Sequence, residues 1–522
     1  MFSYIMKQKR LLLLEAAAAT LRAGCGVLLS FAMGEMTNSA VDGQVAALLR
    51  SSAVCVACLA ALYGLQVLEM YLRKTLSGRC ILALKADLYS ALRERGAAAL
   101  HEQPDSYYLN MLQGDVEILE RDYFDAIWRA INLSIQVVCC AAALITVSAR
   151  LFFIFALVSI VPQLASRWFK RPLQRRKDGF SQQNAQCVQK GREFIGGFDT
   201  ILFFSRAEVF ISRLLDEDKR LERSRRRRDS FSTVASGGAN AINMVAQIVC
   251  MGAAAYFIAV GELRIGALTS STQLLNFIFS PLNVVVNCAL AIVSTRGLRD
   301  KFTSLIHGAR PRGDERFRNG DIVFDNVTAG YAGREVLHGF SCRMERGGRY
   351  AVVGASGAGK STLARALMGT ARVTSGSITI GGVDVEKMPL DELYRHVLYI
   401  PQDTFLFEGT VRDNISLFSG GAKADEAAAK AALPPSLLSE QAGGDRGAAL
   451  SGGEKTRLAV ARALCSPAEV LIFDEPASGL DPDTAGEIER AIGAISGRTV
   501  IVITHNWDEG YLGSFTGVIR PQ

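Results

Sequence analysis

Long apolar stretches dominate the first 305 residues and limit what this part of the chain can fold into. A helix needs about 20 residues to cross the hydrocarbon core of a bilayer. Six stretches approach or exceed that length, and they lie near residues 11–33, 52–71, 126–147, 151–168, 234–260 and 263–293. Only 21% of the 522 residues are charged and 49% are hydrophobic, which excludes a disordered chain. The sequence therefore predicts an α-helical domain of six membrane spans over residues 1–306.

Basic residues are distributed unevenly between the loops that join these stretches. Most of them fall between the second and third stretches and between the fourth and fifth, whereas the opposite loops hold only Arg50, Arg150 and Arg264. Because Lys and Arg are retained on the cytoplasmic side, we expect both basic segments and both termini there, in a multi-pass protein of the cell membrane. These segments are long and helical in pattern, so the membrane helices are expected to continue into the cytoplasm.

The run Arg225–Arg228 is the longest run of consecutive basic residues in the sequence. Nucleic acid binding is one interpretation, but the run lacks interleaved aromatic residues and continues a helix that enters the membrane. We interpret it as a topology anchor near anionic lipid, and no nucleic acid partner is expected.

The composition changes after residue 320, where short β-like runs alternate with helical segments. The predicted strands are 322–324, 350–353, 377–380, 397–400, 470–473 and 500–503. This alternation is typical of an α/β nucleotide-binding domain. The polar segment 307–320, which contains Pro311, is the predicted linker, and residues 321–522 are the predicted second domain.

A phosphate-binding loop follows the second of these strands. Gly354-Ala-Ser-Gly-Ala-Gly-Lys-Ser361 matches the pattern G-x-x-x-x-G-K-[ST] between a strand and a helix. Its backbone N–H groups and the helix N-terminus suit ATP phosphates, Lys360 suits the β and γ oxygens, and Ser361 suits Mg²⁺. The predicted ATP-binding residues here are Gly354, Ser356, Gly357, Gly359, Lys360, Ser361 and Thr362.

Two acidic residues end the strand at 470–473. The carboxyl ends of parallel strands are where such sheets bind ligands. Asp474 is therefore predicted to hold Mg²⁺, and Glu475 to act as the general base that polarises the attacking water.

A third motif, Leu450-Ser451-Gly452-Gly453-Glu454, stands shortly before Asp474. It resembles the LSGGQ signature of ATP-binding cassette (ABC) transporters, with Glu at the last position. In that family the signature of one subunit caps the γ-phosphate held by the phosphate loop of the other. The resemblance implies that Ser451, Gly452 and Gly453 contact ATP in a dimer.

Further elements of the family follow in order. Tyr331 resembles the aromatic residue that stacks on adenine, and Gln402 resembles the glutamine that senses Mg²⁺ and the membrane domain. The segment from Ser478 to Asp481 resembles the loop that crosses the dimer interface, with Gly479 where Ala is usual, and it adds Asp481 to the implied ATP site. His505 resembles the switch histidine at the γ-phosphate. Residues 444–447 loosely resemble a motif of the exporter-type branch.

The resemblance extends to the membrane half. Residues 104–120 and 196–204 resemble the two cytoplasmic turns of exporter-type half-transporters, short cross-helices that dock on the ATPase; ordinary amphipathic connectors are the alternative. The region 419–443 is shorter than usual for the helical subdomain, and the chain ends at Gln522 without the family's usual last strand and helices.

Polar residues follow one helical face in each of the last two apolar stretches. They are Asn240, Asn243 and Gln247 in one, and Asn276, Asn283 and Asn287 in the other. A substrate-lining face and hydrogen bonding between helices both explain them.

Together, the motifs predict ATP-driven transport by a dimer of half-transporters, with ATP and Mg²⁺ as cofactors. Export of an unidentified small molecule, peptide or lipid is favoured, and the partner chain is identical or paralogous. The alternatives are uptake of a siderophore or metal chelate by the same architecture, and a membrane-held ATPase with a regulatory role.

Overall fold

The structure is a computed structural model of the whole chain. It describes all residues except 101–103, 309–311, 332–333, 356, 421–422, 444–449 and 522, and it leaves undescribed the side chains of 97–99, 159, 162–171, 239, 331 and 334. The chain forms two compact units. The first comprises Met1–Lys85 and Met111–Lys301, and the second comprises Ala86–Asn110 and Phe302–Gln522.

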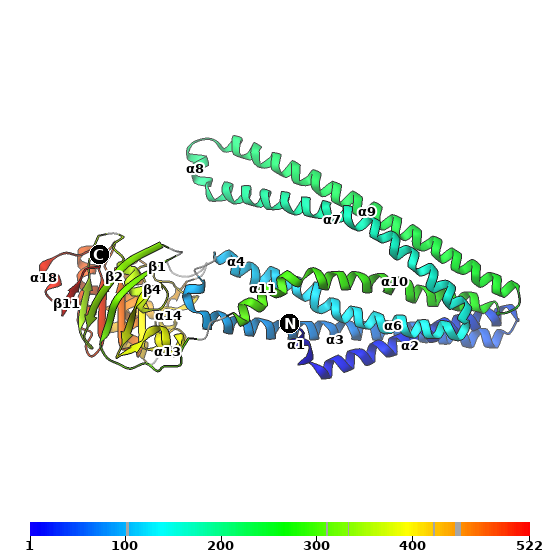
Figure 1. Cartoon of the computed structure of the whole chain (residues 1–522), viewed down its shortest axis with the longest axis horizontal. Coiled ribbons are helices and arrows are strands. Elements are labelled where there is room, and N and C mark those ends of the chain that lie inside the picture. The colour runs from blue at the N-terminus through cyan, green and yellow to red at the C-terminus, as the bar shows by residue number, and fades with distance from the viewer. Residues whose placement is uncertain are drawn as a thin grey trace. The chain divides into compact units, whose positions relative to one another are not determined.

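The first unit consists of helices (Figure 1). Several of them are far longer than a bilayer requires: α9 has 53 residues, which at about 1.5 Å per residue exceeds the roughly 30 Å hydrocarbon core more than twofold. A helix of this length has room to continue beyond the membrane, as expected from the sequence. The helices from the N-terminus to the linker are α1 (Phe2–Met6), α2 (Lys9–Val41), α3 (Val45–Leu100), α4 (Asp105–Asn110), α5 (Val116–Leu119), α6 (Asp125–Val147), α7 (Ala149–Gly196), α8 (Phe198–Phe203), α9 (Ala207–Ala259), α10 (Gly266–Ser294) and α11 (Arg296–His307), with π-helical turns at Met111–Asp115 and Glu120–Phe124.

Five helices among the described residues are long and apolar enough to cross a membrane. They are Lys9–Val41, Val45–Gly96, Asp105–Val147, Ala207–Ala259 and Gly266–Ser294. The predicted fourth span, near 151–168, corresponds to a shorter apolar segment, Ala149–Val158, because its C-terminal part has no described side chains. The described residues thus give a helical membrane domain but leave the count of six as a prediction.

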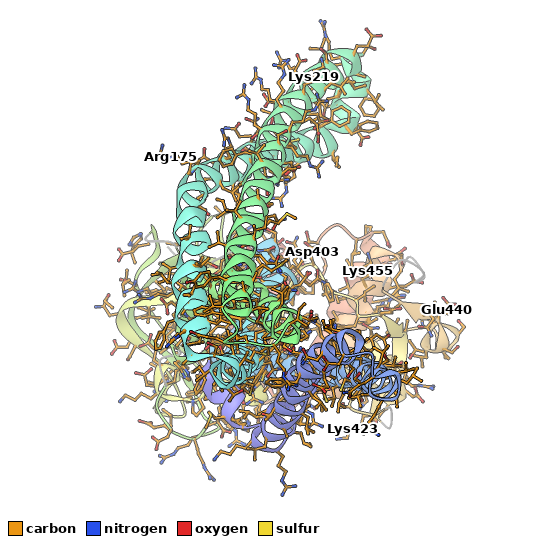
Figure 2. The ribbon with its side chains drawn as sticks, turned by 90° about the vertical axis from the view of Figure 1, so that its right-hand side faces the viewer. Arg175, Lys219, Asp403, Lys423, Glu440 and Lys455 are labelled. Atoms are coloured by element: carbon orange, nitrogen blue, oxygen red, sulfur yellow. The ribbon has the colours of Figure 1, made fainter. Side chains whose placement is uncertain are left out.

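Helices α7 and α9 lie side by side as an antiparallel hairpin that ends in α8 (Figure 1). Arg176 lies over the ring of Phe231 at 3.8 Å and Arg228 over that of Phe180 at 4.0 Å, so arginine–aromatic contacts join the two helices. Other charged side chains, among them Arg175 and Lys219, project outward (Figure 2). At the tip of this hairpin, Phe203 is 83% exposed.

Ion pairs and hydrogen bonds join helices within the first unit. Arg22 of α2 bonds Glu69 of α3 at 2.7 Å, and both side chains are largely buried. In the last two apolar stretches, Gln247 of α9 donates to Asn276 of α10 at 2.8 Å. Hydrogen bonding between helices therefore accounts for this pair, while Asn240 and Asn287 are exposed.

Among its described residues, the second unit holds two larger β-sheets and one two-stranded sheet. An antiparallel sheet has the order β2-β1-β4-β5, and a parallel sheet has the order β11-β3-β10-β9-β6. Their bounds are β1 (Ile322–Tyr331), β2 (Arg334–Met344), β3 (Arg349–Val352), β4 (Arg372–Ile380), β5 (Val383–Asp384), β6 (Val397–Ile400), β9 (Val470–Asp474), β10 (Thr499–Ile503) and β11 (Gly517–Ile519), and β7 (Gly409–Thr410) pairs separately with β8 (Gln441–Ala442).

All six predicted strands are present in these sheets. One strand after His505 was not among the predicted ones: Gly517–Ile519 pairs in parallel with β3 at the edge of the sheet. This strand has only three residues, and its short pattern carries too little signal in the sequence.

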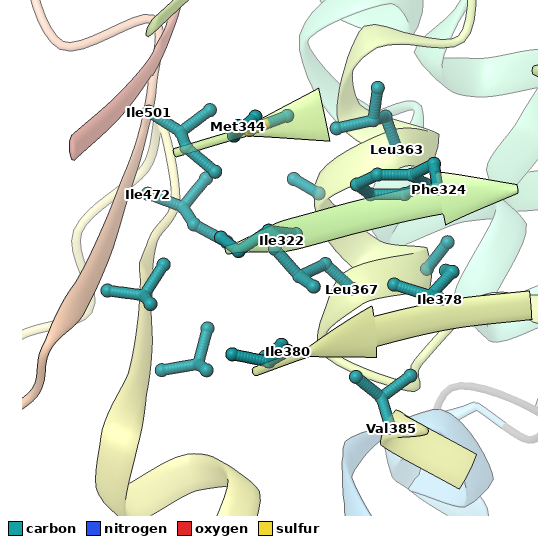
Figure 3. Packing of buried hydrophobic residues seen from close by; sticks show 14 of the residues in the cluster. Ile322, Phe324, Met344, Leu363, Leu367, Ile378, Ile380, Val385, Ile472 and Ile501 are labelled. Carbon is teal, nitrogen blue, oxygen red and sulfur yellow. The ribbon is translucent and has the colours of Figure 1, made fainter. Parts of the chain in front are cut away.

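Helices cover the parallel sheet on both faces, as the near-continuous apolar strands require. The described α-helices that follow β3 are α12 (Lys360–Leu367), α13 (Leu390–His396), α14 (Val411–Ser416), α15 (Ala424–Lys430), α16 (Gly452–Cys465), α17 (Pro482–Gly493) and α18 (Glu509–Leu512). Successive residues of each strand point to opposite faces of the sheet and pack into two different hydrophobic cores. Ile472 and Ile501 face the antiparallel sheet and α12 (Figure 3), whereas Phe473 faces α16 and its neighbours.

Candidate functional site

The phosphate loop runs from the end of β3 to the start of α12. Its glycines permit the tight path: Gly357 and Gly359 have φ of 85° and 83°, a region that side chains disfavour. A Cβ at Gly359 would also lie 2.8 Å from Leu337 Cδ2. Lys360, 6% exposed, folds over the loop and donates to the carbonyl oxygens of Gly354 and Ala355. The loop and its lysine thus form one compact site, of which Ser356 lies outside the described residues.

Ser361 and Asp474 meet at the carboxyl end of the parallel sheet. The Ser361 hydroxyl lies 3.4 Å from Asp474 Oδ1, although the two residues are 113 positions apart in the sequence. Thr362, the next residue of α12, is buried. The register of β9 between β6 and β10 holds Asp474, 7% exposed, at this edge. Two oxygen groups therefore face each other beside the phosphate loop, as predicted from the strand ends.

Glu475 forms the centre of a second group. Its carboxylate bonds His505 Nε2 through Oε1 at 2.8 Å and accepts from Gln402 Nε2 through Oε2 at 3.3 Å. The residue has φ of 50°, a strained conformation for a non-glycine residue that occurs often at functional sites. Three residues from the ends of three strands are thus brought together.

The signature motif lies at the start of α16. Ser451 is the N-cap: its hydroxyl accepts from the Glu454 N–H at 3.3 Å, and the Glu454 carboxylate accepts from the Ser451 N–H at 2.7 Å. This reciprocal cap explains why Glu fits the last position of the motif, and the backbone hydrogen bond lowers the pKa of Glu454. The close approach to α17 requires Gly453, since a Cβ there would lie 2.9 Å from Thr484.

The structure gives less information on the roles of the other predicted site residues. Asp481 is the N-cap of α17, and its carboxylate accepts from the Thr484 N–H at 3.0 Å, which lowers the pKa of Asp481. Gly452 is the first residue of α16. Tyr331 ends β1, but its side chain is among those not described, and residues 444–447 also lie outside the described residues.

Sequence reasoning missed Tyr399 of β6. Its hydroxyl donates to Asp474 Oδ2 at 2.6 Å, and burial together with this bond raises the pKa of Tyr399. A signal existed, since the predicted strand at 397–400 places a tyrosine three residues before Gln402, but nothing in the sequence shows which strand lies beside Asp474.

Known families match both halves of this arrangement. A family model described as "ABC transporter transmembrane region" matches residues 12–282, and one described as "ABC transporter" matches residues 337–478. The chain belongs to the ABC transporter family. Its helical membrane domain and its ATP-binding cassette are fused in one chain, and the phosphate loop, Asp474 and the signature motif all lie within the cassette match.

Two curated relatives are similar to parts of the chain. A putative multidrug export ATP-binding/permease protein, YgaD of Bacillus subtilis, is 30% identical over 284 residues, 51% of this chain and 49% of that protein. A mycobactin import ATP-binding/permease protein, IrtA of Mycolicibacterium smegmatis, is 42% identical over 193 residues, 35% of this chain and 22% of that protein. The chain thus spans less than half the length of these curated relatives.

A solved structure of a bacterial Atm1-family ABC exporter with ATP bound resembles the whole chain. The TM-score is 0.83 with 21% sequence identity, and the match covers 98% of this chain and 93% of that one. This likeness shows the fold, which is that of an exporter-type transporter with a membrane domain followed by a cassette.

Proposed function

We propose that the chain is a half-transporter that dimerises and moves a substrate across the cell membrane at the expense of ATP. The observation that carries the proposal is the group formed by Glu475, His505 and Gln402 beside the phosphate loop, in a cassette fused to membrane helices. A carboxylate held between a histidine and a glutamine suits a general base for water attack on a γ-phosphate.

The residues of the site divide the chemistry between them. Gly354, Gly357, Gly359, Lys360 and Thr362 would bind the phosphates, and Tyr331 would bind the adenine. Glu475 would accept the proton of the attacking water, while His505 orients the carboxylate and contacts the γ-phosphate.

Mg²⁺ fits the oxygen groups of Ser361 and Asp474, with Gln402 near the same edge. No group of three or more His, Cys, Asp or Glu in the described part of the chain is arranged to hold a metal. A cation here would therefore rely on these few oxygens, the phosphates and water, the manner in which Mg²⁺ is usually bound. When bound, it would neutralise the charge that develops on the phosphate oxygens.

Two features support a dimer. Ser451 and Gly452 are exposed at the N-terminus of α16, with Gly453 next to them, and a helix N-terminus favours a phosphate. The Ser451 side chain bonds Glu454 of its own motif. The phosphate of a second chain is the ligand that suits the N-terminus of α16, with Asp481 on the adjacent helix start. In addition, Phe203 and Phe204 at the hairpin tip are 83% and 75% exposed, which suits docking on a partner cassette.

The C-terminal end of α3, which precedes the first predicted cytoplasmic turn, offers a route for coupling. Within the second unit, Gly96 of α3 lies so close to α13 that a Cβ would be 2.5 Å from Leu390, and Arg93 pairs with Asp391 at 3.7 Å. Movement of α13 would therefore be transmitted to the end of α3. Because β6 and Gln402 directly follow α13 in the chain, this movement would also be linked to the ATP site.

We further propose that residues 1–306 form six membrane spans, residues 307–320 a linker and residues 321–522 the cassette. The cassette and both termini would lie in the cytoplasm. Export is the proposed direction, since the similar fold is that of an exporter. Uptake of a metal chelate is the second candidate, because one relative is named for mycobactin import. Accumulation of substrate in right-side-out vesicles would favour uptake over export.

The first test is Mg²⁺-dependent ATP hydrolysis by the purified chain alone in lipid nanodiscs. We expect turnover by a dimer of identical chains, and chelation of Mg²⁺ with EDTA should abolish it. A folded, dimeric chain that binds ATP but does not hydrolyse it would contradict the proposal for the identical dimer and direct the search to a paralogous partner.

A further inference from the structure

The Asp474 carboxylate has different neighbours on its two oxygens. Oδ1 faces the Ser361 hydroxyl at 3.4 Å, while Oδ2 accepts the hydrogen bond of Tyr399 at 2.6 Å. A hydroxyl at this distance from a carboxylate is a strong donor. The tyrosine therefore fixes the rotation of the carboxylate and leaves Oδ1 directed at Ser361.

The sheet register explains how Tyr399 reaches this position. Tyr399 of β6 is paired with Ile472 of β9, and Asp474 lies two residues further along β9. Side chains two residues apart in a strand share a face, so Tyr399, Ile472 and Asp474 all face α12. Leu398 and Ile400 point to the opposite core, and a shift of one residue in β6 would remove the hydroxyl from the site.

Helix α12 places a positive charge near this hydroxyl. Burial and the bond to Asp474 raise the pKa of Tyr399, and Arg365, one helical turn after Ser361, acts in the opposite direction. The hydroxyl thus lies between the helix of the phosphate loop and the strand that carries Asp474.

We propose that Tyr399 is a positioning residue for Mg²⁺–ATP: it holds the Asp474 carboxylate so that Oδ1, together with the Ser361 hydroxyl, faces the cation. The inference rests on the proposed function, because it assumes an Mg²⁺–ATP site at Ser361 and Asp474. Hydrogen bonds to a ligating carboxylate orient it, and their removal typically costs about 10- to 100-fold in metal affinity.

The test measures how much a bound metal ion increases the affinity of the chain for ATP. A fluorescent ATP analogue, methylanthraniloyl-ATP, is titrated against the full-length chain in nanodiscs, once with Mn²⁺ and once with EDTA. For Tyr399→Phe we expect the Mn²⁺-dependent gain to fall about tenfold, while the affinity in EDTA stays at the wild-type value.

A matched control is Tyr350→Phe. Tyr350 is a core tyrosine of β3 whose hydroxyl accepts from the Glu345 N–H at 2.6 Å, away from Asp474. This variant also loses one buried hydroxyl but should keep the full metal-dependent gain. An equal loss in both variants, or a loss of affinity in EDTA as well, would show that Tyr399 acts only on stability and would overturn the inference.

Measurements on the wild-type chain show whether a negative result concerns only the role of Tyr399 or also the proposed function. If it shows a metal-dependent gain and Tyr399→Phe keeps it in full, the role of Tyr399 is wrong and the proposed function stands. If the wild-type chain binds the analogue without any metal-dependent gain and does not hydrolyse ATP, the proposed function and the inference both fail.

Discussion

Replacement of Glu475 by Gln is expected to lower ATP turnover by about 10²- to 10⁴-fold, the usual contribution of a general base. The amide keeps the size of the side chain and its hydrogen bond to His505 or Gln402 but cannot accept the proton of the attacking water. ATP binding should persist, because the phosphate loop and Lys360 are unchanged. Phosphate release by the purified chain in nanodiscs, with nucleotide binding measured in parallel, tests this expectation.

A suitable control for this variant is Glu469→Gln. Glu469 precedes the same strand, but its carboxylate bonds His396 at 2.8 Å, remote from Asp474 in the register of β9. We expect near-normal turnover from it. Retention of turnover in Glu475→Gln, or an equal loss in both variants, would contradict the role given to Glu475.

Removal of the Glu69 carboxylate is the change with the largest expected effect on the membrane domain. Glu69 and Arg22 are only 8% and 16% exposed and lie 2.7 Å apart, so Glu69→Ala leaves a buried guanidinium without its partner. Loss of one member of a buried ion pair typically costs about 3–5 kcal/mol. We therefore expect the variant to unfold at a clearly lower temperature or detergent concentration than the wild-type chain.

Two further variants show whether the pairing itself is the cause. The double change Arg22→Ala with Glu69→Ala removes both charges and should be more stable than Glu69→Ala alone. Glu262→Ala breaks the pair with Arg150, whose side chains are 45% and 70% exposed, and exposed pairs contribute about 0–1 kcal/mol. Equal losses in Glu69→Ala and Glu262→Ala would show that burial of the first pair has no energetic consequence.

Much of the cassette could be predicted from sequence because its signals are local. The phosphate loop needs glycines at fixed positions between a strand and a helix, and the predicted strands of the parallel sheet have short apolar runs. The meeting of Gln402, Glu475 and His505 was also predictable, since each follows a parallel strand and such strand ends share one edge.

Other features depend on contacts that sequence patterns do not encode. Strand β2 (Arg334–Met344) has a mixed pattern because it pairs at the edge of an antiparallel sheet, and its irregular register with β1 obscures the alternation. The hydrogen bond of Tyr399 requires β6 to lie beside β9, an order that crosses the sequence. The pair formed by Arg22 and Glu69 spans 47 residues and two helices, so their charges could not be matched in advance.

The measurement that tests the central claim most directly compares two purified dimers that carry the same two changes. In one dimer, Lys360→Ala is in one chain and Gly452→Asp is in the other. In the second dimer, one chain carries both changes and its partner is wild-type. If each ATP site takes its phosphate loop from one chain and its signature from the other, only the first dimer keeps a site free of both changes.

We therefore predict faster Mg²⁺-dependent ATP hydrolysis by the dimer with the changes in separate chains. The dimer with both changes in one chain has one change in each shared site and should be nearly inactive. The reverse order, with turnover retained only beside a wild-type chain, would show that each site is complete within one chain and would contradict the account.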